Sequence, residues 1–321
     1  MKTLRRGLLL SALMMAAQGA WAQGYPAKPV RVVIPFAPGG GTDVVARPVV
    51  LKLGEALGKP MLYDNRGGAN GIIGADLVAK SPADGYTLLL ASSGALVLNV
   101  GLYDKLPYDP VRDFAPITML AVAPNVLVAH PSVPVKNVQE MMAYAKANPN
   151  KLNFALTGGG AASLATELFR SMSGLPVESI PYKGAGPALT AVLAGEVQMM
   201  FANAGVFLPN IRAGKLRPLA VSSLQRLKVL PDVPTVNESG VKGFEGSSWF
   251  GIVAPTGTPA PIINQLYEET AKVLKSADIQ DRYTAEGAIA VGNTPAQFGE
   301  QIKSEIVKWV KVIKDTGMKA E

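Results

Sequence analysis

The sequence contains no cysteine and a single histidine, and these two shortages exclude several kinds of site. Without cysteine the chain has no disulfide, no thiol nucleophile and no cysteine-based metal centre. Metal sites built on two or three histidines are excluded as well. His130 stands at the end of an apolar run, directly before Pro131, where we expect a strand-end residue with a satisfied hydrogen bond. No G-x-S-x-G sequence accompanies it, so we expect neither catalysis by His130 nor a bound metal.

Long apolar runs are also lacking, except near the N-terminus. There, three basic residues precede an apolar run over 8–17, and the small residues Ala20 and Ala22 form the pattern that signal peptidase requires. A membrane anchor is the competing interpretation, but the run is shorter than the roughly 20 residues of a spanning helix. The sequence therefore predicts a signal peptide over 1–22, cleavage between Ala22 and Gln23, and an exported protein.

Charge of one sign is not concentrated either. The chain has 31 Lys and Arg, three of them in the leader, against 24 Asp and Glu, so the surplus after cleavage is only four. Such a mild and dispersed surplus does not indicate a nucleic-acid partner.

Short β-rich runs alternate with segments of helical period, which is typical of an α/β fold with parallel sheets. Apolar runs predict strands at 30–36, 61–63, 87–91, 126–129, 152–156, 197–201 and 216–221. Helices are predicted at 42–57, 70–80, 137–147, 161–173, 186–194, 205–213, 259–275 and 296–314. Two helix starts carry capping patterns, Asn137 with Glu140 and Thr294 with Gln297.

A pseudo-repeat divides this pattern in two. The stretches FAPGGGTDVVA (36–46) and ALTGGGAASLA (155–165) each run from an apolar strand through three glycines into an amphipathic helix. Two α/β lobes with one such turn each explain the repetition.

Two extended passages mark where the lobes are joined. The proline-rich segment 106–124 resembles a crossing to the second lobe, and 244–261 a crossing back. We expect residues 23–123 together with 244–321 to form the first lobe, and 124–243 the second. Two crossings place a hinge behind a cleft.

The glycine turns match no nucleotide-binding motif, because G-x-x-x-x-G-K-[ST] is absent and Ala69 replaces a glycine of G-x-G-x-x-G. We expect no cofactor. Glycines let the backbone approach a ligand closely, with free N–H groups at the helix start, and the helix dipole favours a negative group there. A small carboxylate suits this arrangement. A tight connection that binds nothing is the alternative for each turn, but packing does not require the same turn twice.

The candidate ligand-binding residues lie in the two turns and at neighbouring strand ends. Hydroxyl groups of Thr42, Thr157 and Ser163 can add hydrogen bonds, whereas Asp43 is more simply a helix cap. Trp249 either walls the pocket or packs in the core. The full set is Phe36, Gly40, Gly41, Thr42, Asp43, Ser92, Ser93, Thr157, Gly158, Gly159, Gly160, Ser163, Tyr182, Asn203 and Trp249. No residue is expected to be catalytic.

Six stretches, in order along the chain, resemble the Bug-type solute receptors of tripartite tricarboxylate transporters. They are YPAKPVRVVIPFAPGGGTD, NRGGANGIIGADLVAKSPADGYTLL, YDPVRDFAPIT, KLNFALTGGGAA, VPTVNESG and SSWFGIVAPTGTP. The resemblance implies a two-lobed type II periplasmic binding protein of the Venus-flytrap kind with two crossing strands. It also implies a carboxylate held between the lobes by backbone groups, hydroxyls and water, a membrane permease as partner, and a monomeric receptor.

The chain departs from the family at two places. Many members have an Asp-Asn pair where this chain has Ala202 and Asn203, which makes an amino acid a less obvious ligand. The second turn is smaller and less polar than usual, so we expect a bulkier or more apolar carboxylate, aromatic ones included. Two other functions remain open: a ligand-responsive sensor subunit, and an enzyme using Ser163 or Asp43, although no base accompanies either group.

Overall fold

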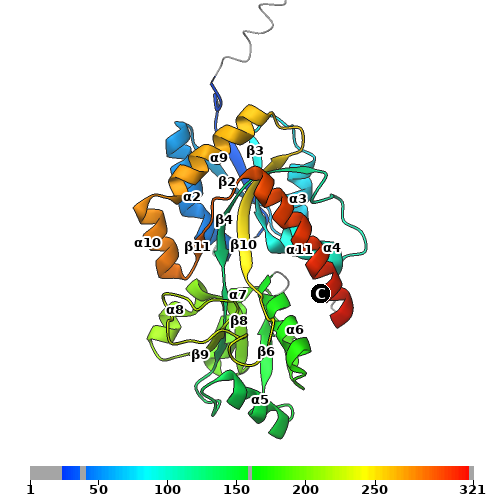
Figure 1. The fold of residues 1–321 in the computed structure, drawn as a ribbon, viewed down its shortest axis with the longest axis vertical. Helices are drawn as coiled ribbons and strands as arrows, with labels where there is room; N and C mark the ends of the chain where they lie inside the picture. Colours follow the sequence, from blue (N-terminus) through cyan, green and yellow to red (C-terminus); the bar gives the residue numbers. More distant parts are fainter. Residues whose placement is uncertain (1–23, 37–40, 158–160, 318–321) are drawn as a thin grey trace, which may run out of the picture.

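The computed structural model describes residues 24–36, 41–157 and 161–317, and it places them in two α/β lobes joined by two crossing strands (Figure 1). The two-lobed α/β fold expected from the sequence is confirmed. Within the described part of the chain, no helix combines the length and apolarity that crossing a membrane requires.

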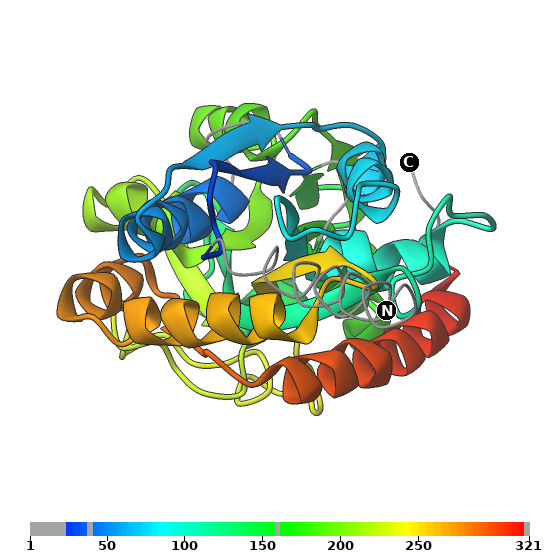
Figure 2. The same cartoon turned by 90° about the horizontal axis from the view of Figure 1, so that it is seen from above.

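The first lobe is built on a six-stranded sheet with the order β11-β4-β10-β3-β1-β2. Its strands are β1 (Val30–Ile34), β2 (Met61–Asn65), β3 (Thr87–Ser92), β4 (Phe114–Ala123), β10 (Ser248–Pro255) and β11 (Ile289–Ala290). The helices are α2 (Gly41–Leu57), α3 (Ile72–Ala79), α4 (Asn99–Leu102), α9 (Ala260–Leu274), α10 (Ala277–Glu286) and α11 (Pro295–Thr316). Two short segments complete it, the 3₁₀ turn η1 (Ala69–Gly71) and the π-helical η2 (Gly94–Leu98). Seen from above, α9 and α11 lie on one side and β1 and β2 on the opposite side (Figure 2).

The second lobe has a five-stranded sheet with the order β7-β6-β8-β5-β9. Its strands are β5 (Asn125–Ala129), β6 (Asn153–Leu156), β7 (Glu178–Pro181), β8 (Met199–Asn203) and β9 (Arg217–Val221). Its helices are α5 (Val138–Ala147), α6 (Ala161–Ser173), α7 (Ala185–Ala194) and α8 (Ala204–Arg212).

The pseudo-repeat extends well beyond the glycine turns. In the first lobe β1 pairs in parallel with β2 and β3, and in the second lobe β6 pairs in parallel with β7 and β8. Helices α2 and α3 connect the first set of strands, and α6 and α7 connect the second. Each lobe therefore contains the same β-α-β-α-β unit with the same strand order.

The expectation of parallel sheets holds only inside this repeated unit, and both sheets are in fact mixed. Strand β10 is antiparallel to β3 and β4, and β5 is antiparallel to β8 and β9. The reason is topological, because a chain that enters the second lobe on β4 and returns on β10 must pass the hinge in opposite directions (Figure 1). The predicted crossing at 106–124 is thus largely the long strand β4, with Pro116 at a register shift that tolerates the missing N–H.

Both predicted capping patterns are confirmed. The Asn137 side chain accepts a hydrogen bond from the Glu140 N–H at 2.8 Å and begins α5. Thr294 and Gln297 form a reciprocal capping box at the start of α11. Each cap satisfies backbone N–H groups that have no partner within their own helix.

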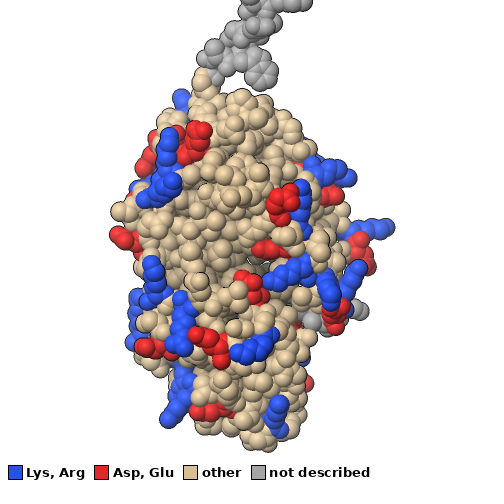
Figure 3. Space-filling view, in the orientation of Figure 1, with Lys and Arg blue, Asp and Glu red and all other residues tan. Residues whose placement is uncertain are grey.

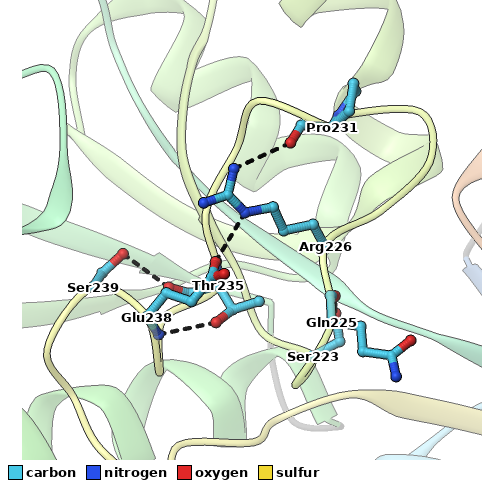
Figure 4. A network of polar contacts seen from close by, with 7 residues as sticks. All are labelled: Ser223, Gln225, Arg226, Pro231, Thr235, Glu238 and Ser239. Atoms are coloured by element: carbon cyan, nitrogen blue, oxygen red, sulfur yellow. Dashed lines mark hydrogen bonds and ion pairs between the residues drawn. The ribbon is translucent and has the colours of Figure 1, made fainter.

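The long return segment between β9 and β10 is held by polar contacts rather than by regular structure (Figure 4). Glu238 accepts from the Thr235 N–H at 2.7 Å and from Arg226 Nε at 3.0 Å, and its own N–H donates to Thr235 Oγ1 at 3.0 Å. These bonds, led by the one from the Thr235 backbone, hold the pKa of Glu238 below its usual value. These bonds therefore fix the backbone conformation of the segment that leads into β10.

The lobes touch on both sides of the crossing strands. On one side the end of α10 meets the start of α8, and on the other α11 packs against α6. Gly287 has φ 70°, and a Cβ at this position would lie 2.7 Å from Ala204 Cβ, so glycine permits the first contact. Lys308 of α11 pairs with Glu245 of the return segment at 3.2 Å. On the face shown in Figure 3, basic and acidic side chains are interspersed over both lobes.

Candidate functional site

In each repeated unit the three parallel strands end at the same edge of the sheet. In open α/β sheets, ligands bind outside the carboxyl ends of such strands. In the first lobe these ends are Ile34, Asn65 and Ser92, and in the second they are Leu156, Pro181 and Asn203. The predicted site residues, except Trp249, follow or close these strands.

The first-lobe edge is assembled around Gly71. Its φ is 87°, and a Cβ here would lie 3.2 to 3.3 Å from Pro35, Phe36 and Ala95, so only glycine lets the three strand ends converge. Asn65 Nδ2 donates to the Phe36 carbonyl at 2.9 Å and fixes the entry to the first glycine turn.

The backbone beside Gly71 is unusual for residues with side chains. Ala69 and Asn70 both have positive φ, 45° and 52°, and such conformations cluster at functional sites. Neither residue is among the site residues predicted from the sequence. The glycine-rich segment around Asn70 could have indicated these positive φ values, since asparagine tolerates this conformation better than most residues.

Ser92 and Ser93 are buried, with 5% and 3% of their surface exposed. Ser92 Oγ accepts from the Ala95 N–H at 3.3 Å, and Ser93 Oγ accepts from the Trp249 N–H at 3.5 Å. Ser93 also lines a small recess together with Leu98, Ala161, Leu164, Gly246, Ser247 and Trp309. The recess is thus lined from both lobes, by Ser93 of the first and by Ala161, the residue that directly follows the second glycine turn.

Hydroxyl groups close the second turn. Ser163 Oγ lies 3.2 Å from the Thr157 N–H, which donates to it, and 3.2 Å from Thr157 Oγ1. The first turn of α6 is therefore tied back to the end of β6. Tyr182 extends the parallel ladder, because its N–H donates to the Leu156 carbonyl at 3.0 Å, and its side chain packs half-buried against the second-lobe core.

Asn203 ends β8, and its side chain is already engaged within the chain. Nδ2 donates to the Ala123 carbonyl at 2.9 Å, to Asn125 Oδ1 at 3.1 Å and to Ser248 Oγ at 3.2 Å. Asn125 and Ser248 are not among the site residues predicted from the sequence. The available signal was Asn125 itself, a lone amide inside the apolar run 119–129.

Trp249 lies in the core of the first lobe, with 2% of its surface exposed. Its ring stands edge-on to Phe298 at 5.3 Å between centroids, and Nε1 donates to Glu305 Oε2 at 2.6 Å. Burial raises the pKa of Glu305 despite this bond. Core packing, one of the two interpretations of Trp249, explains the position of its indole ring. Contact between Trp249 and a ligand stays a prediction.

The remaining predicted positions concern the turns themselves. Gly41, Thr42 and Asp43 open α2, and Thr42 is buried. The four glycines Gly40, Gly158, Gly159 and Gly160 lie outside the described residues.

As expected for a strand-end residue, His130 follows β5, and its Nδ1 lies 2.7 Å from Ser132 Oγ.

The described side chains of the site offer hydrogen-bond donors and acceptors. Its described side chains are hydroxyls, amides and aromatic rings, and no group of His, Asp and Glu able to hold a metal occurs among the described residues. Such an arrangement can bind and orient a small polar molecule.

Known proteins share both the sequence and the fold. A family described as the tripartite tricarboxylate transporter family receptor matches residues 45–318. Protein BugT of Bordetella pertussis is 40% identical over 315 residues, which cover 98% of this chain and 96% of BugT.

Two solved structures extend the likeness to three dimensions. R. palustris Rpa4515, solved with adipate, is 37% identical with a TM-score of 0.86, and the match covers 91% of this chain and 98% of that one. MatC from Rhodopseudomonas palustris, solved with bound malate, is 33% identical with a TM-score of 0.83, covering 90% and 100%. The family match, the relative and the shared fold agree with the resemblance of the six motifs, and the chain belongs to the receptor family of the tripartite tricarboxylate transporters.

Proposed function

We propose that this chain is an exported solute receptor that binds a small organic carboxylate between its lobes and delivers it to a tripartite tricarboxylate-type membrane transporter. The observation that carries the proposal is the β-α-β-α-β unit repeated in the two lobes. Residues that follow the strand ends of both units, Ser93 in the first lobe and Ala161 in the second, line one recess. The adipate and malate bound by two similar proteins support a carboxylate as the ligand.

The proposed site follows from the same geometry. Donors from the first turn, at Gly40 to Thr42, and from the second, at Thr157 to Gly160, converge on one carboxylate group. Closure that buries the ligand from both sides supplies the roughly 8 kcal/mol that micromolar affinity needs, without any chemical step. The smaller second turn, with Ala161 and Ala162 at the helix start, supports a bulkier carboxylate, including an aromatic one.

We also propose the division of the chain. Residues 1–22 are a signal peptide, and the lobes comprise 23–123 with 244–321, and 124–243. Strand β4 ends at Ala123 in the first sheet and β5 begins at Asn125 in the second, which supports the first boundary. The receptor acts as a monomer.

A ligand panel tests the proposal. Adipate, malate, benzoate, glutamate and arginine are compared by thermal shift, followed by calorimetry and by mass spectrometry of the recovered ligand. We expect simple carboxylates to raise the melting temperature, by the equivalent of about 2.7 kcal/mol at 100 times Kd, and to be recovered unchanged. Stabilisation by the amino acids alone would contradict the proposed ligand class, and chemical conversion would favour an enzyme.

One pair of variants tests the second-lobe contact. Thr157→Ala removes a hydroxyl at the second turn and should weaken carboxylate binding about fivefold, the loss of one hydrogen bond. Thr190→Ala is the matched control, because Thr190 is exposed on α7 and its hydroxyl donates to the Gly186 carbonyl of its own helix. Equal affinities of the two variants would remove Thr157 from the site.

A further inference from the structure

The hinge consists of two short bends between two ladders. In the first lobe the pairing of β4 with β10 ends at Ala123 and Ser248. In the second lobe the pairing of β5 with β8 begins at Asn125 and Asn203. Only Pro124 separates the two ladders on the outgoing crossing. A rotation of one lobe against the other must therefore alter the contacts between these two pairs.

Asn125 makes the second-lobe side of the hinge a rigid block. It is fully buried, and its N–H donates to Ser222 Oγ at 2.8 Å while its carbonyl accepts from the Ser222 N–H at 2.8 Å. Its Nδ2 donates to the Gly246 carbonyl at 2.6 Å, which ties the return segment to the outgoing one. A buried amide with all its groups paired resists displacement, because any lost bond leaves a desolvated polar atom.

Asn203 reaches across the bends. It belongs to the second lobe, yet two of its three acceptors, the Ala123 carbonyl and Ser248 Oγ, belong to the crossing strands of the first lobe. A carbonyl can only accept, so Asn203 must present its NH₂ group to this side. The orientation of the carboxamide is thereby fixed by chemistry.

Three acceptors share the two hydrogens of Asn203 Nδ2. A rotation that withdraws the Ala123 carbonyl and Ser248 Oγ leaves Asn125 Oδ1 as the one remaining acceptor of the three, so one N–H of Asn203 loses its partner. We propose that Asn203 is a positioning residue of the hinge, which holds the lobes in the arrangement described here and links the cleft edge at the end of β8 to both crossing strands. The inference rests on the proposed function only in that such a receptor must open and close.

The lobe arrangement can be measured directly, because the natural chain has no thiols. Glu55→Cys on α2 and Lys146→Cys on α5 are exposed positions in different lobes, and spin labels there report the interlobe distance. In the ligand-free protein, two populations are compared: lobes at the interlobe distance that dominates in wild type, and lobes at any other distance. Asn203→Ala should lower the ratio of the first population to the second about fivefold, the loss of one hydrogen bond. Asn203→Asp should act more strongly at neutral pH, because a carboxylate offers no donor to three acceptors.

Protonation provides a rescue that a purely structural role would not show. Lowering the pH from about 7 to about 4 should restore one donor in the Asn203→Asp variant and return part of its distance distribution towards that of wild type. Wild type and Asn203→Ala, measured in parallel, serve as controls for any general effect of acid. Ser248→Ala removes one first-lobe acceptor and should give a smaller shift in the same direction.

Distributions that match wild type in the Asn203 variants would overturn the inference. Where those variants fail to fold, an unchanged distribution in Ser248→Ala would do so. A separate arm adds saturating adipate to the labelled wild-type chain. Absence of any response to adipate or to the rest of the ligand panel counts against the proposed function, whereas the ligand-free distances decide the role of Asn203.

Discussion

At the scale of single residues, Glu305 combines a buried carboxyl group with a hydrogen bond from the Trp249 indole. Burial is the main cause that raises its pKa above the ordinary value near 4.5. The folded state therefore binds this proton more tightly than the unfolded state. The contribution of Glu305 to stability is complete below about pH 4.5 and is lost as the pH rises through the raised pKa.

Glu305→Gln should remove this pH dependence. Its amide oxygen can still accept from Trp249 Nε1, and no charge has to be buried, so the variant should gain stability relative to wild type as the pH rises from about 4 to about 8. Urea unfolding across that range measures the difference. Glu300→Gln, at an exposed position paired with Lys303 on the same helix, is the control. A difference between Glu305→Gln and wild type that stays constant with pH would refute the argument.

The residue scale also shows how far the site could be predicted from sequence. Turn glycines and hydroxyls such as Thr157 and Ser163 follow from the local strand-to-helix pattern. The partners of Asn203 do not, because Asn125 lies 78 residues away and meets it only through the pairing of β5 with β8. Trp249 is ambiguous for a similar reason, since Phe298 and Glu305 reach it from a distant helix.

At the scale of elements, the start of α11 depends on the capping box of Thr294 and Gln297. Thr294→Ala leaves the Gln297 N–H without its partner, Thr294 Oγ1, and should lower the free energy of unfolding by about 1 kcal/mol. Urea unfolding should show a lower midpoint with an unchanged slope. Thr284→Ala, an exposed position inside α10, should change stability by less than about 0.5 kcal/mol. Equal losses in the two variants would mean that the cap contributes nothing specific.

Elements with a clear period were predicted well, and those without one were not. Helix α6 occupies the predicted range 161–173, because its buried and exposed residues alternate with helical spacing. Helix α10 was missed, since only Ile279 and Tyr283 of its ten residues are buried. Strand β4 was predicted only as part of a proline-rich extended crossing, because its antiparallel partner β10 lies more than a hundred residues later in the chain.

At the scale of the whole molecule, the two lobes share part of their core. One hydrophobic cluster runs from Leu89 and Phe298 in the first lobe to Phe154 and Phe201 in the second, with Trp309 among its members. Because apolar contact continues past the hinge, opening the lobes must expose apolar surface. Burial of this surface therefore favours closure together with any ligand that binds the closed state more tightly.

Trp309 should report this movement through its fluorescence. From Gln23 onward the chain has two tryptophans, Trp249 in the first-lobe core and Trp309, which lines the recess between the lobes and is 6% exposed. A change in lobe arrangement alters the solvation of Trp309 and leaves Trp249 packed on Phe298. Adipate, or whichever carboxylate the panel selects, should therefore shift the emission of wild type and of Trp249→Phe, but not that of Trp309→Phe. If the response instead disappears only in Trp249→Phe, the ligand acts on the indole of Trp249, as expected if this residue walls the pocket, and Trp309 does not sense closure.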